Sequence, residues 1–239
     1  MSKYRNFLAV STFLTVVAAA TSAQAAVISL NFEGVNATYP SGFAQVGGFY
    51  NGGTSSDATS GTNFGVEFTD NALAICLNTP GTVCSNTSRG GIGDPASDKG
   101  GLFFLSGAET FMNVAAGFDT GFSFNYAAIN QGGTINVFDG LGGTGTLLGS
   151  IVLGLTTSNC GPEYSAGFCP FVSAFVAFAG IAKSVSFGGV ANQIVFDDVT
   201  FGSITPGSTI PVPAALPLLL TAIGGLGVAS RFRKNRTAA

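Results

Sequence analysis

Apolar and polar residues alternate at every second position in several short segments of this chain, and this pattern limits the possible folds more than any other feature. Ile28, Leu30 and Phe32 lie on one side of an extended chain, with polar residues between them. The same alternation recurs at 64–68, 122–126, 184–187 and 193–201. Because successive side chains of a strand point to opposite faces, the pattern predicts half-buried β-strands.

The segments between these strands are rich in glycine, asparagine, serine and threonine, which are typical of turns. Glycine accounts for 35 of the 239 residues, and no segment within 26–205 has the apolar spacing of a helix. Many short strands joined by turns predict an all-β domain, an antiparallel β-sandwich and within that class a jelly roll. We expect the 22 phenylalanines to fill the layer between its sheets.

One glycine-rich segment matches the G-x-G-x-x-G pattern of dinucleotide-binding sites, at residues 140–145. Such a site needs a helix directly after the glycines, because the helix N-terminus binds the pyrophosphate. Residues 146–153 instead have the composition of a strand, and a second expected strand precedes the glycines at 134–138. The segment is therefore predicted to be the turn of a β-hairpin.

Residues 1–25 have the composition of a cleaved signal peptide. Lys3 and Arg5 precede an apolar run at 7–20, and Ala23-Gln24-Ala25 has the small residues that signal peptidase requires. The alternative is an uncleaved anchor, but the run is shorter than the roughly 20 residues that span a bilayer. We expect the mature chain to begin at Ala26.

A second apolar segment lies at 214–229 and is followed at once by a basic tail. The cations of this tail are Arg231, Arg233, Lys234 and Arg236. Lys and Arg beside a membrane segment stay in the cytoplasm, so the residues before it should lie outside. The segment predicts a transmembrane helix that is either a plain single-span anchor or part of a sorting signal.

The order of features at this end resembles a PEP-CTERM sorting signal. The motif residues are Ile210, Pro211, Val212, Pro213 and Ala214, followed by the apolar helix and the basic tail. Val212 stands where the namesake triplet has glutamate, and the segment is similar to V-P-x-P-A variants of the same group. Residues 206–239 are therefore assigned to the signal, as a short linker, the helix and the tail.

This resemblance implies how the chain is exported and processed, and where the mature protein acts. PEP-CTERM proteins are processed in Gram-negative bacteria by exosortase, a membrane protease-transpeptidase. The chain would be anchored in the inner membrane during transit and then move to the cell surface or extracellular matrix. Proteins with this signal tend to accompany exopolysaccharide production, which implies a role in a biofilm.

Charge and composition exclude several classes of function. Residues 26–210 contain twelve acidic residues but only Arg89, Lys99 and Lys183 as cations, a net charge of −9. Such a surface repels phosphate backbones, so we expect no nucleic-acid partner. The chain also has no histidine. This excludes Ser-His-Asp hydrolysis, Cys-His proteolysis and histidine-ligated zinc.

The four cysteines all fall in the part of the chain that is expected to be exported, where oxidation is favoured. Three pairings are possible. Cys76–Cys84 and Cys160–Cys169 each bracket a glycine and a proline, so two local disulfides are the simplest prediction. The alternative, a metal site, lacks both C-x2-C spacing and histidine.

The adjacent carboxylates of Asp197 and Asp198 interrupt an alternating segment, and the alternation would turn Asp197 inward with Val195 and Val199. In jelly rolls the first and last strands commonly lie close together, and Glu33 ends the first expected strand. Glu33, Asp197 and Asp198 could thus hold a structural Ca²⁺ with backbone and asparagine oxygens. The alternative is a bulge that turns the extra carboxylate to solvent.

Two classes of function follow. The first is a non-catalytic surface or matrix protein that binds extracellular polysaccharide or lends structure to a biofilm. The chain has no tryptophan to stack on sugars, so tyrosines would take that role. The candidates are Tyr39, Tyr50, Tyr126 and Tyr164.

The second class is a secreted glycan-cleaving enzyme, which needs a pair of carboxylates on either side of the bond it cleaves. The candidates are Glu33, Glu67, Glu109 and Glu163. None of them falls in a recognisable catalytic motif, and each is equally well explained as a residue that faces solvent. We therefore predict that the protein is not an enzyme and assign no catalytic residue.

Overall fold

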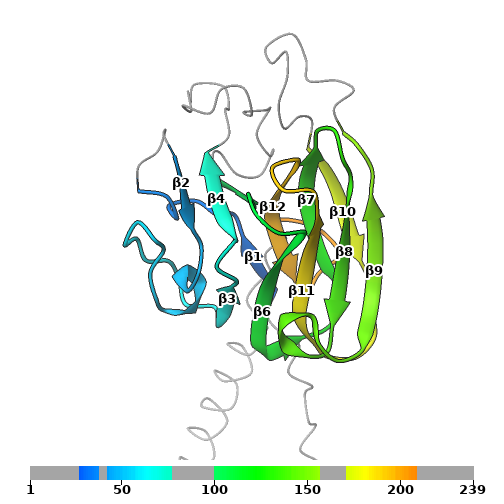
Figure 1. Cartoon of the computed structure of the whole chain (residues 1–239). Coiled ribbons are helices and arrows are strands. Elements are labelled where there is room, and N and C mark those ends of the chain that lie inside the picture. The colour runs from blue at the N-terminus through cyan, green and yellow to red at the C-terminus, as the bar shows by residue number, and fades with distance from the viewer. Residues whose placement is uncertain (1–26, 38–41, 77–99, 157–170, 209–239) are drawn as a thin grey trace, which may run out of the picture.

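The computed structural model describes residues 27–37, 42–76, 100–156 and 171–208 (Figure 1). The predicted signal peptide, sorting motif and basic tail lie outside these residues, as do Cys84, Cys160 and Cys169. No helix in the described part of the chain is long and apolar enough to cross a membrane. The helical elements among the described residues are two short 3₁₀ turns, η1 at Phe49–Asn51 and η2 at Leu141–Gly143.

Two antiparallel sheets make up the fold. In the larger sheet the strand order is β10 (Val172–Val176), β7 (Phe122–Ala128), β12 (Ile194–Phe201), β5 (Gly100–Phe103), β4 (Leu73–Cys76) and β2 (Phe43–Gln45). β1 (Ile28–Leu30) also pairs with β12 and is the seventh strand of this sheet. The five-stranded sheet has the order β3 (Val66–Phe68), β6 (Glu109–Phe118), β11 (Ala182–Gly189), β8 (Gly133–Phe138) and β9 (Leu147–Leu153). The prediction of an all-β, antiparallel fold is confirmed.

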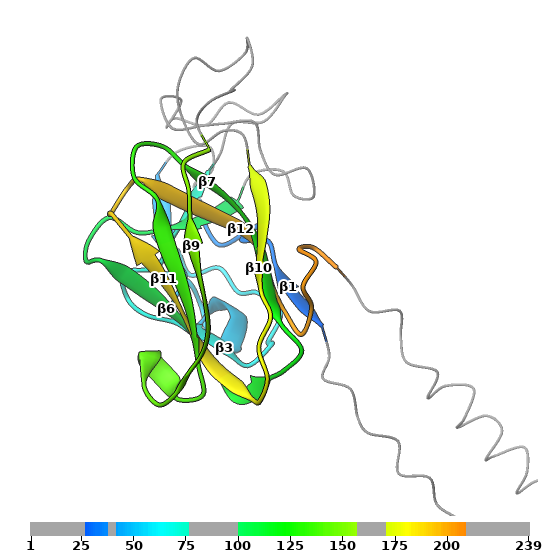
Figure 2. The same cartoon turned by 90° about the vertical axis from the view of Figure 1, so that its right-hand side faces the viewer.

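The sheets pack face to face through a phenylalanine-rich layer. The ring of Phe187, on the five-stranded sheet, lies 4.9 Å from that of Phe196 and 5.8 Å from that of Phe122, both on the larger sheet. All three side chains are fully buried. Rings at these separations and tilts add to the free energy that burial itself contributes. The two sheets are visible as two layers of strands in Figure 2.

The outer face of the larger sheet carries a second, smaller apolar cluster. It consists of Leu73, Ile75, Phe103, Ala127 and Val195. Strand β12 therefore contributes to two cores, because alternate residues point to opposite faces. Phe196 faces the inner layer and Val195 the outer cluster. This explains why β12 is buried along its whole length.

The glycine-rich segment at 140–145 joins β8 to β9 as a hairpin, as predicted. Gly142, Gly143 and Gly145 all have positive φ angles, which side-chain-bearing residues seldom adopt. At Gly143 the backbone also approaches the ring of Phe111 so closely that a Cβ would overlap it. The glycines thus allow the positive φ angles of the turn and its close packing against Phe111.

The segments before β5 add to both sheets. β2 and β4 extend the larger sheet, while β3 extends the five-stranded sheet. The loop that contains η1 lies beside the outer edges of β2 and β3. The N–H of Gln45 donates to Ser56 Oγ (2.9 Å), and the N–H of Phe68 donates to the carbonyl of Gly47 (3.0 Å). This N-terminal region, residues 27–76, contains an open cleft.

Candidate functional site

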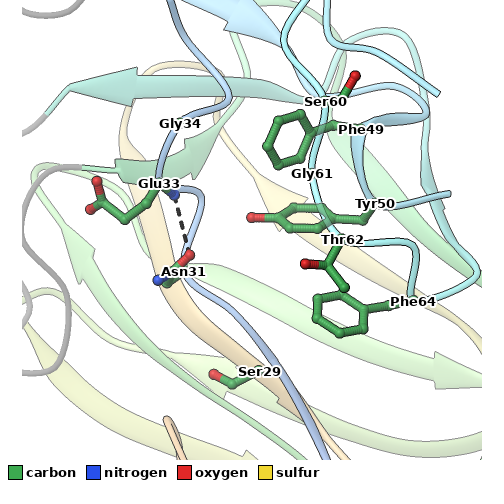
Figure 3. Close-up of a pocket in the computed structure, with 10 residues that line it drawn as sticks. All are labelled: Ser29, Asn31, Glu33, Gly34, Phe49, Tyr50, Ser60, Gly61, Thr62 and Phe64. Carbon is green, nitrogen blue, oxygen red and sulfur yellow. Dashed lines mark hydrogen bonds between the residues drawn. The ribbon is translucent and has the colours of Figure 1, made fainter. Parts of the chain in front are cut away.

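An open cleft of about 550 Å³ lies between the segment that follows β1 and the loop that follows η1 (Figure 3). Its described lining residues are Ser29, Asn31, Glu33, Gly34, Phe49, Tyr50, Ser60, Gly61, Thr62 and Phe64. All of them belong to the N-terminal region. The hydroxyls of Ser29, Ser60 and Thr62, one amide and one carboxylate thus line the same space as the aromatic rings.

The aromatic wall of the cleft is built on Tyr50. Its ring stacks on Phe64, with centroids 6.2 Å apart, and meets Phe49 edge-on at 4.8 Å. Phe49 and Tyr50 are buried, whereas Phe64 is half-buried. Gly61 lies against the Phe49 ring so closely that a Cβ there would overlap it. The wall is therefore held by packing on both sides, and Phe64 offers the most accessible aromatic surface.

The polar rim is held in place by a tight turn after β1. Asn31 Oδ1 accepts a hydrogen bond from the N–H of Glu33 (3.3 Å), and Glu33 Oε1 accepts one from the N–H of Gly100 (2.7 Å). Phe32 has a φ of 56°, in the left-handed region that costs a side-chain-bearing residue energy. Its N–H donates to the Tyr50 hydroxyl (2.9 Å) and so ties this strained residue to the aromatic wall.

A close backbone contact joins the cleft to the larger sheet. At Gly100, the first residue of β5, a Cβ would overlap the carbonyl group of Phe32. Any larger residue would push the turn away from β5 and break the hydrogen bond to Glu33. Glycine at this position therefore sets how deeply the rim of the cleft sits against the sheet.

The acidic pair lies on β12 at a β-bulge. The pairing register of β12 with β7 shifts between Asp197 and Thr200, and Asp198 has a φ of 46°. The bulge places Val199 in the inner layer, while Val195 and Asp197 belong to the outer face. The predicted common face for Val195, Asp197 and Val199 is therefore wrong, since the extra residue reverses the alternation.

The bulge does not expose either carboxylate, so that part of the prediction is also wrong. Asp197 is 1% exposed and Asp198 is 3% exposed. Asp197 Oδ1 accepts a hydrogen bond from the N–H of Asp198 (2.7 Å), and Asn125 Nδ2 donates to Asp198 Oδ2 (3.2 Å). Ser173 Oγ donates in turn to Asn125 Oδ1 (2.7 Å). Both carboxylates thus belong to a hydrogen-bond network that crosses three strands, as buried charges require.

The expected proximity of the first and last strands is confirmed, since Leu30 of β1 pairs with Val199 of β12. Glu33, however, lies in the cleft and bonds to Gly100, while the two aspartates bond to one another and to Asn125. The part of the chain that the structure describes holds no group of three or more His, Cys, Asp or Glu side chains placed for a metal ion. Calcium binding by these three residues stays a prediction.

The other candidate carboxylates lie apart from the cleft lining. Glu67 is exposed on β3, and Glu109 begins β6, where its Oε2 accepts a hydrogen bond from Ser186. Glu163 lies outside the described residues. Glu33 is the one acidic side chain among the described lining residues. The described lining residues therefore form a cleft with a single carboxylate.

Two of the four tyrosines proposed for sugar stacking are described, and both are buried: Tyr50 at 4% exposure and Tyr126 at 7%. Burial raises the pKa of Tyr126, and a hydrogen bond with the Gly154 backbone opposes that rise. Tyr39 and Tyr164 lie outside the described residues. Tyr50 does line the cleft, but as its inner wall, and Phe64 is the aromatic residue that sequence reasoning missed.

Cys76 is the one described cysteine. It ends β4, is buried and is disulfide-bonded. The predicted partner, Cys84, and the second predicted pair lie outside the described residues. The local pairing of the four cysteines stays a prediction.

Comparison with known proteins gives weak similarities. No family model matches the chain, and no curated protein matches it. Among solved structures, the K2 cleaved adhesin domain of Lys-gingipain is 12% identical, with a TM-score of 0.41 over 74% of this chain and 99% of that chain. A glycoside hydrolase family 43 arabinoxylan arabinofuranohydrolase from Bacillus subtilis, in complex with cellotetraose, is 20% identical, with a TM-score of 0.32 over 45% of this chain.

This chain spans only 22% of the length of that arabinofuranohydrolase. At TM-scores this low, neither similarity carries an argument about this chain. The candidate site therefore rests on its own geometry.

Proposed function

We propose that this chain is an exported, non-catalytic protein of the cell surface or extracellular matrix, and that its cleft binds a neutral extracellular polysaccharide. The observation that carries the proposal is the lining of the cleft. Ser29, Asn31, Ser60 and Thr62 offer hydroxyl and amide groups beside the accessible ring of Phe64. Small-molecule sites typically combine an apolar wall with a few convergent polar groups, and a sugar presents both kinds of surface.

The negative charge of the cleft and of the exported chain favours a neutral ligand over an anionic one. Glu33 is a carboxylate within the cleft, and no cation occurs among the described lining residues. The exported part of the chain has a net charge of −9. An anionic polysaccharide would meet repulsion both at long range and in the cleft.

A binding role is favoured over cleavage because glycoside hydrolysis needs two carboxylates about 5 to 10 Å apart. Glu33 is joined in the described lining by hydroxyls and an amide, and by no second carboxylate. These groups donate and accept hydrogen bonds but supply no acid-base pair. The cleft is thus suited to holding a glycan without cutting it.

The route to the surface is the part of the proposal that rests on the sequence alone. The signal peptide at 1–25 brings the chain across the inner membrane, and an exosortase-like enzyme processes the PEP-CTERM-like signal at 206–239. Intact-mass analysis of surface protein should show a chain that begins at Ala26 and lacks residues 231–239. Detection of the Arg231–Arg236 cluster on mature surface protein would show a permanent anchor instead.

We further propose that β5 to β12 form a jelly roll. The order β5-β12-β7-β10 in one sheet and β6-β11-β8-β9 in the other supports it. Eight antiparallel strands in two four-stranded sheets match that topology, in which every connection except the β8–β9 hairpin crosses between the sheets. β1 to β4 are then an addition to the eight strands, and the cleft belongs to this addition.

A structural Ca²⁺ held by Glu33, Asp197 and Asp198 is the remaining part of the proposal. The burial of both aspartates supports it, because two adjacent carboxylates in a weakly solvated place are stabilised by a cation. Asp197 already accepts a hydrogen bond from the N–H of Asp198, and Asp198 accepts one from Asn125, so the ion would add to a network already present.

The experiment that tests polysaccharide binding is affinity electrophoresis of the mature protein in gels that contain a neutral or an anionic polysaccharide. We expect retardation by the neutral polymer. The double variant Asn31→Ala/Thr62→Ala should bind at least about tenfold more weakly, which corresponds to about 1.4 kcal/mol. Thr54→Ala/Asn130→Ala is a matched control, since both residues are exposed and neither lines the cleft. Equal retardation of the cleft variant and the control would contradict the proposed site.

A further inference from the structure

The open edges of the two sheets lie side by side at β9 and β10 (Figure 2). β9 is the last strand of the five-stranded sheet, and β10 is the last strand of the larger sheet. Gly149 of β9 packs so closely against Val176 of β10 that a Cβ there would overlap the valine side chain. One side of the molecule therefore presents two neighbouring strand edges.

On the opposite side of the molecule, the strand edges are covered by a loop. The outer edge of β2 is bonded to the loop at Ser56, and β3 is bonded to Gly47, so both short edges are covered. In the described part of the chain, the backbone of β9 is hydrogen-bonded to β8 alone and that of β10 to β7 alone. Among the residues that the structure describes, no second strand pairs with their outer N–H and C=O groups, which could therefore bond to another strand.

These two edges are also apolar and uncharged. Val152 of β9 is 79% exposed, and Phe175 of β10 is 51% exposed. Leu147 and Val172 on the same strands are exposed as well. Neither 147–153 nor 172–176 contains a charged residue or a proline, the two devices that most often prevent edge strands from pairing.

We propose that β9 pairs antiparallel with β9 of a second copy of this chain and joins the two five-stranded sheets into one. A two-fold axis makes the same edge complementary to itself, so the pairing needs no other partner sequence. The absence of charged residues on the β9 edge favours a second copy as the partner. Two molecules of net charge −9 repel each other, but an uncharged edge lets them meet without bringing carboxylates together.

The proposed contact uses main-chain bonds for affinity and side chains for burial. Seven residues of β9 give a longer edge than the five of β10, and Val152 is the most exposed large apolar residue of the described chain. Val152 and Leu147 lie on β9 itself and become partly covered by the partner strand. This inference does not depend on the cleft, which lies in the N-terminal region.

Sedimentation velocity of the mature protein tests the proposal. We expect a dimer at micromolar concentration for the wild-type protein. Val152→Lys should raise the dissociation constant at least about tenfold, because the variant puts like charges on both sides of the two-fold axis. Val190→Lys is the matched control, since Val190 is 50% exposed but lies between β11 and β12, away from the edge. It should dimerise like the wild type.

Amide hydrogen exchange provides a second measurement. Exchange within 147–153 should slow as the protein concentration rises, while exchange within 66–68 should not change. A wild-type protein that stays monomeric at about 100 μM would overturn the proposal, because paired main chains of this length should be populated there. Dissociation by Phe175→Lys but not by Val152→Lys would place the contact on β10 and refute pairing through β9.

Discussion

The N-terminal region, residues 27–76, and the eight strands β5 to β12 are built in different ways. The eight strands contain elements of up to ten residues and bury most of the phenylalanine layer. The N-terminal region has strands of three or four residues, and side-chain hydrogen bonds hold its loops. The described lining of the cleft comes entirely from the second kind of structure. From this difference we expect that stability and the proposed ligand recognition are separable in this protein.

The largest expected effect is the loss of a ring from the layer between the sheets. Phe187→Ala removes a fully buried side chain that contacts Phe122 and Phe196, and should lower the free energy of unfolding by about 3–5 kcal/mol. Urea denaturation measures the loss. Phe64→Ala, in the half-buried wall of the cleft, should cost less than half as much but should weaken polysaccharide binding. Equal losses of stability would contradict the separation of the two regions.

The second effect concerns the contact that joins the regions. Gly100→Ala brings a methyl group against the Phe32 carbonyl and should cost about 1–3 kcal/mol through backbone displacement. Binding should weaken too, because Glu33 loses its bond to Gly100. Gly154→Ala is the control, since no atom lies within 4 Å of its added Cβ. If Gly100→Ala lowers neither the melting temperature nor the affinity, the contact does not position the cleft.

The third effect tests the proposed calcium, which would link the cleft to β12. At a free concentration about 100 times its dissociation constant, an ion adds about 2.7 kcal/mol to stability. The melting temperature should then fall by several degrees in EDTA, and Asp197→Asn should remove most of that difference. Glu67→Gln, at the exposed position of β3, should preserve it. Identical wild-type melting curves in EDTA and in millimolar calcium would show that no structural ion is bound.

The smallest effect is a pH dependence within the eight strands. Burial raises the pKa of Tyr126 above its ordinary value of 10.0, so the folded protein keeps this proton at a pH where the unfolded chain releases it. The stability that Tyr126 contributes is complete below pH 10 and falls as the pH rises through the folded-state pKa. Thermal melts between pH 9 and about 12 should therefore show a shallower alkaline decline for Tyr126→Phe. If the stability of Tyr126→Phe declines as steeply as that of the wild type, the alkaline loss of stability comes from other groups.

The strands that alternate cleanly could be predicted from the sequence. Residues 122–126 and 193–201 correspond to β7 and β12, and the glycines at 140–145 form the predicted hairpin. β6 was missed, although it is the longest strand. Its apolar alternation ends at Ala115–Ala116, where small side chains give no pattern, and Gly117 has a positive φ angle. Periodicity cannot reveal a strand whose irregularity is imposed by its neighbours.

The cleft could be predicted only in part. Glu33 was singled out, but its neighbours at 60–64 lie in a loop about 30 residues away, and no sequence pattern links the two segments. Asp197 was expected to turn inward, but the burial of Asp198 beside it was missed for a related reason. A bulge adds one residue to β12, and a single added residue reverses which face every later side chain occupies.

Hydrogen exchange of the mature protein with and without saturating neutral polysaccharide tests the central claim most directly. We predict slower exchange in the described cleft segments, 29–34 and 49–64, and unchanged exchange in β7, β8 and β11. The same experiment with an anionic polysaccharide should change neither set. Protection centred on β7, β8 or β11, with exchange in the cleft unaltered, would contradict the account, because recognition would then belong to the eight strands and not to the N-terminal region.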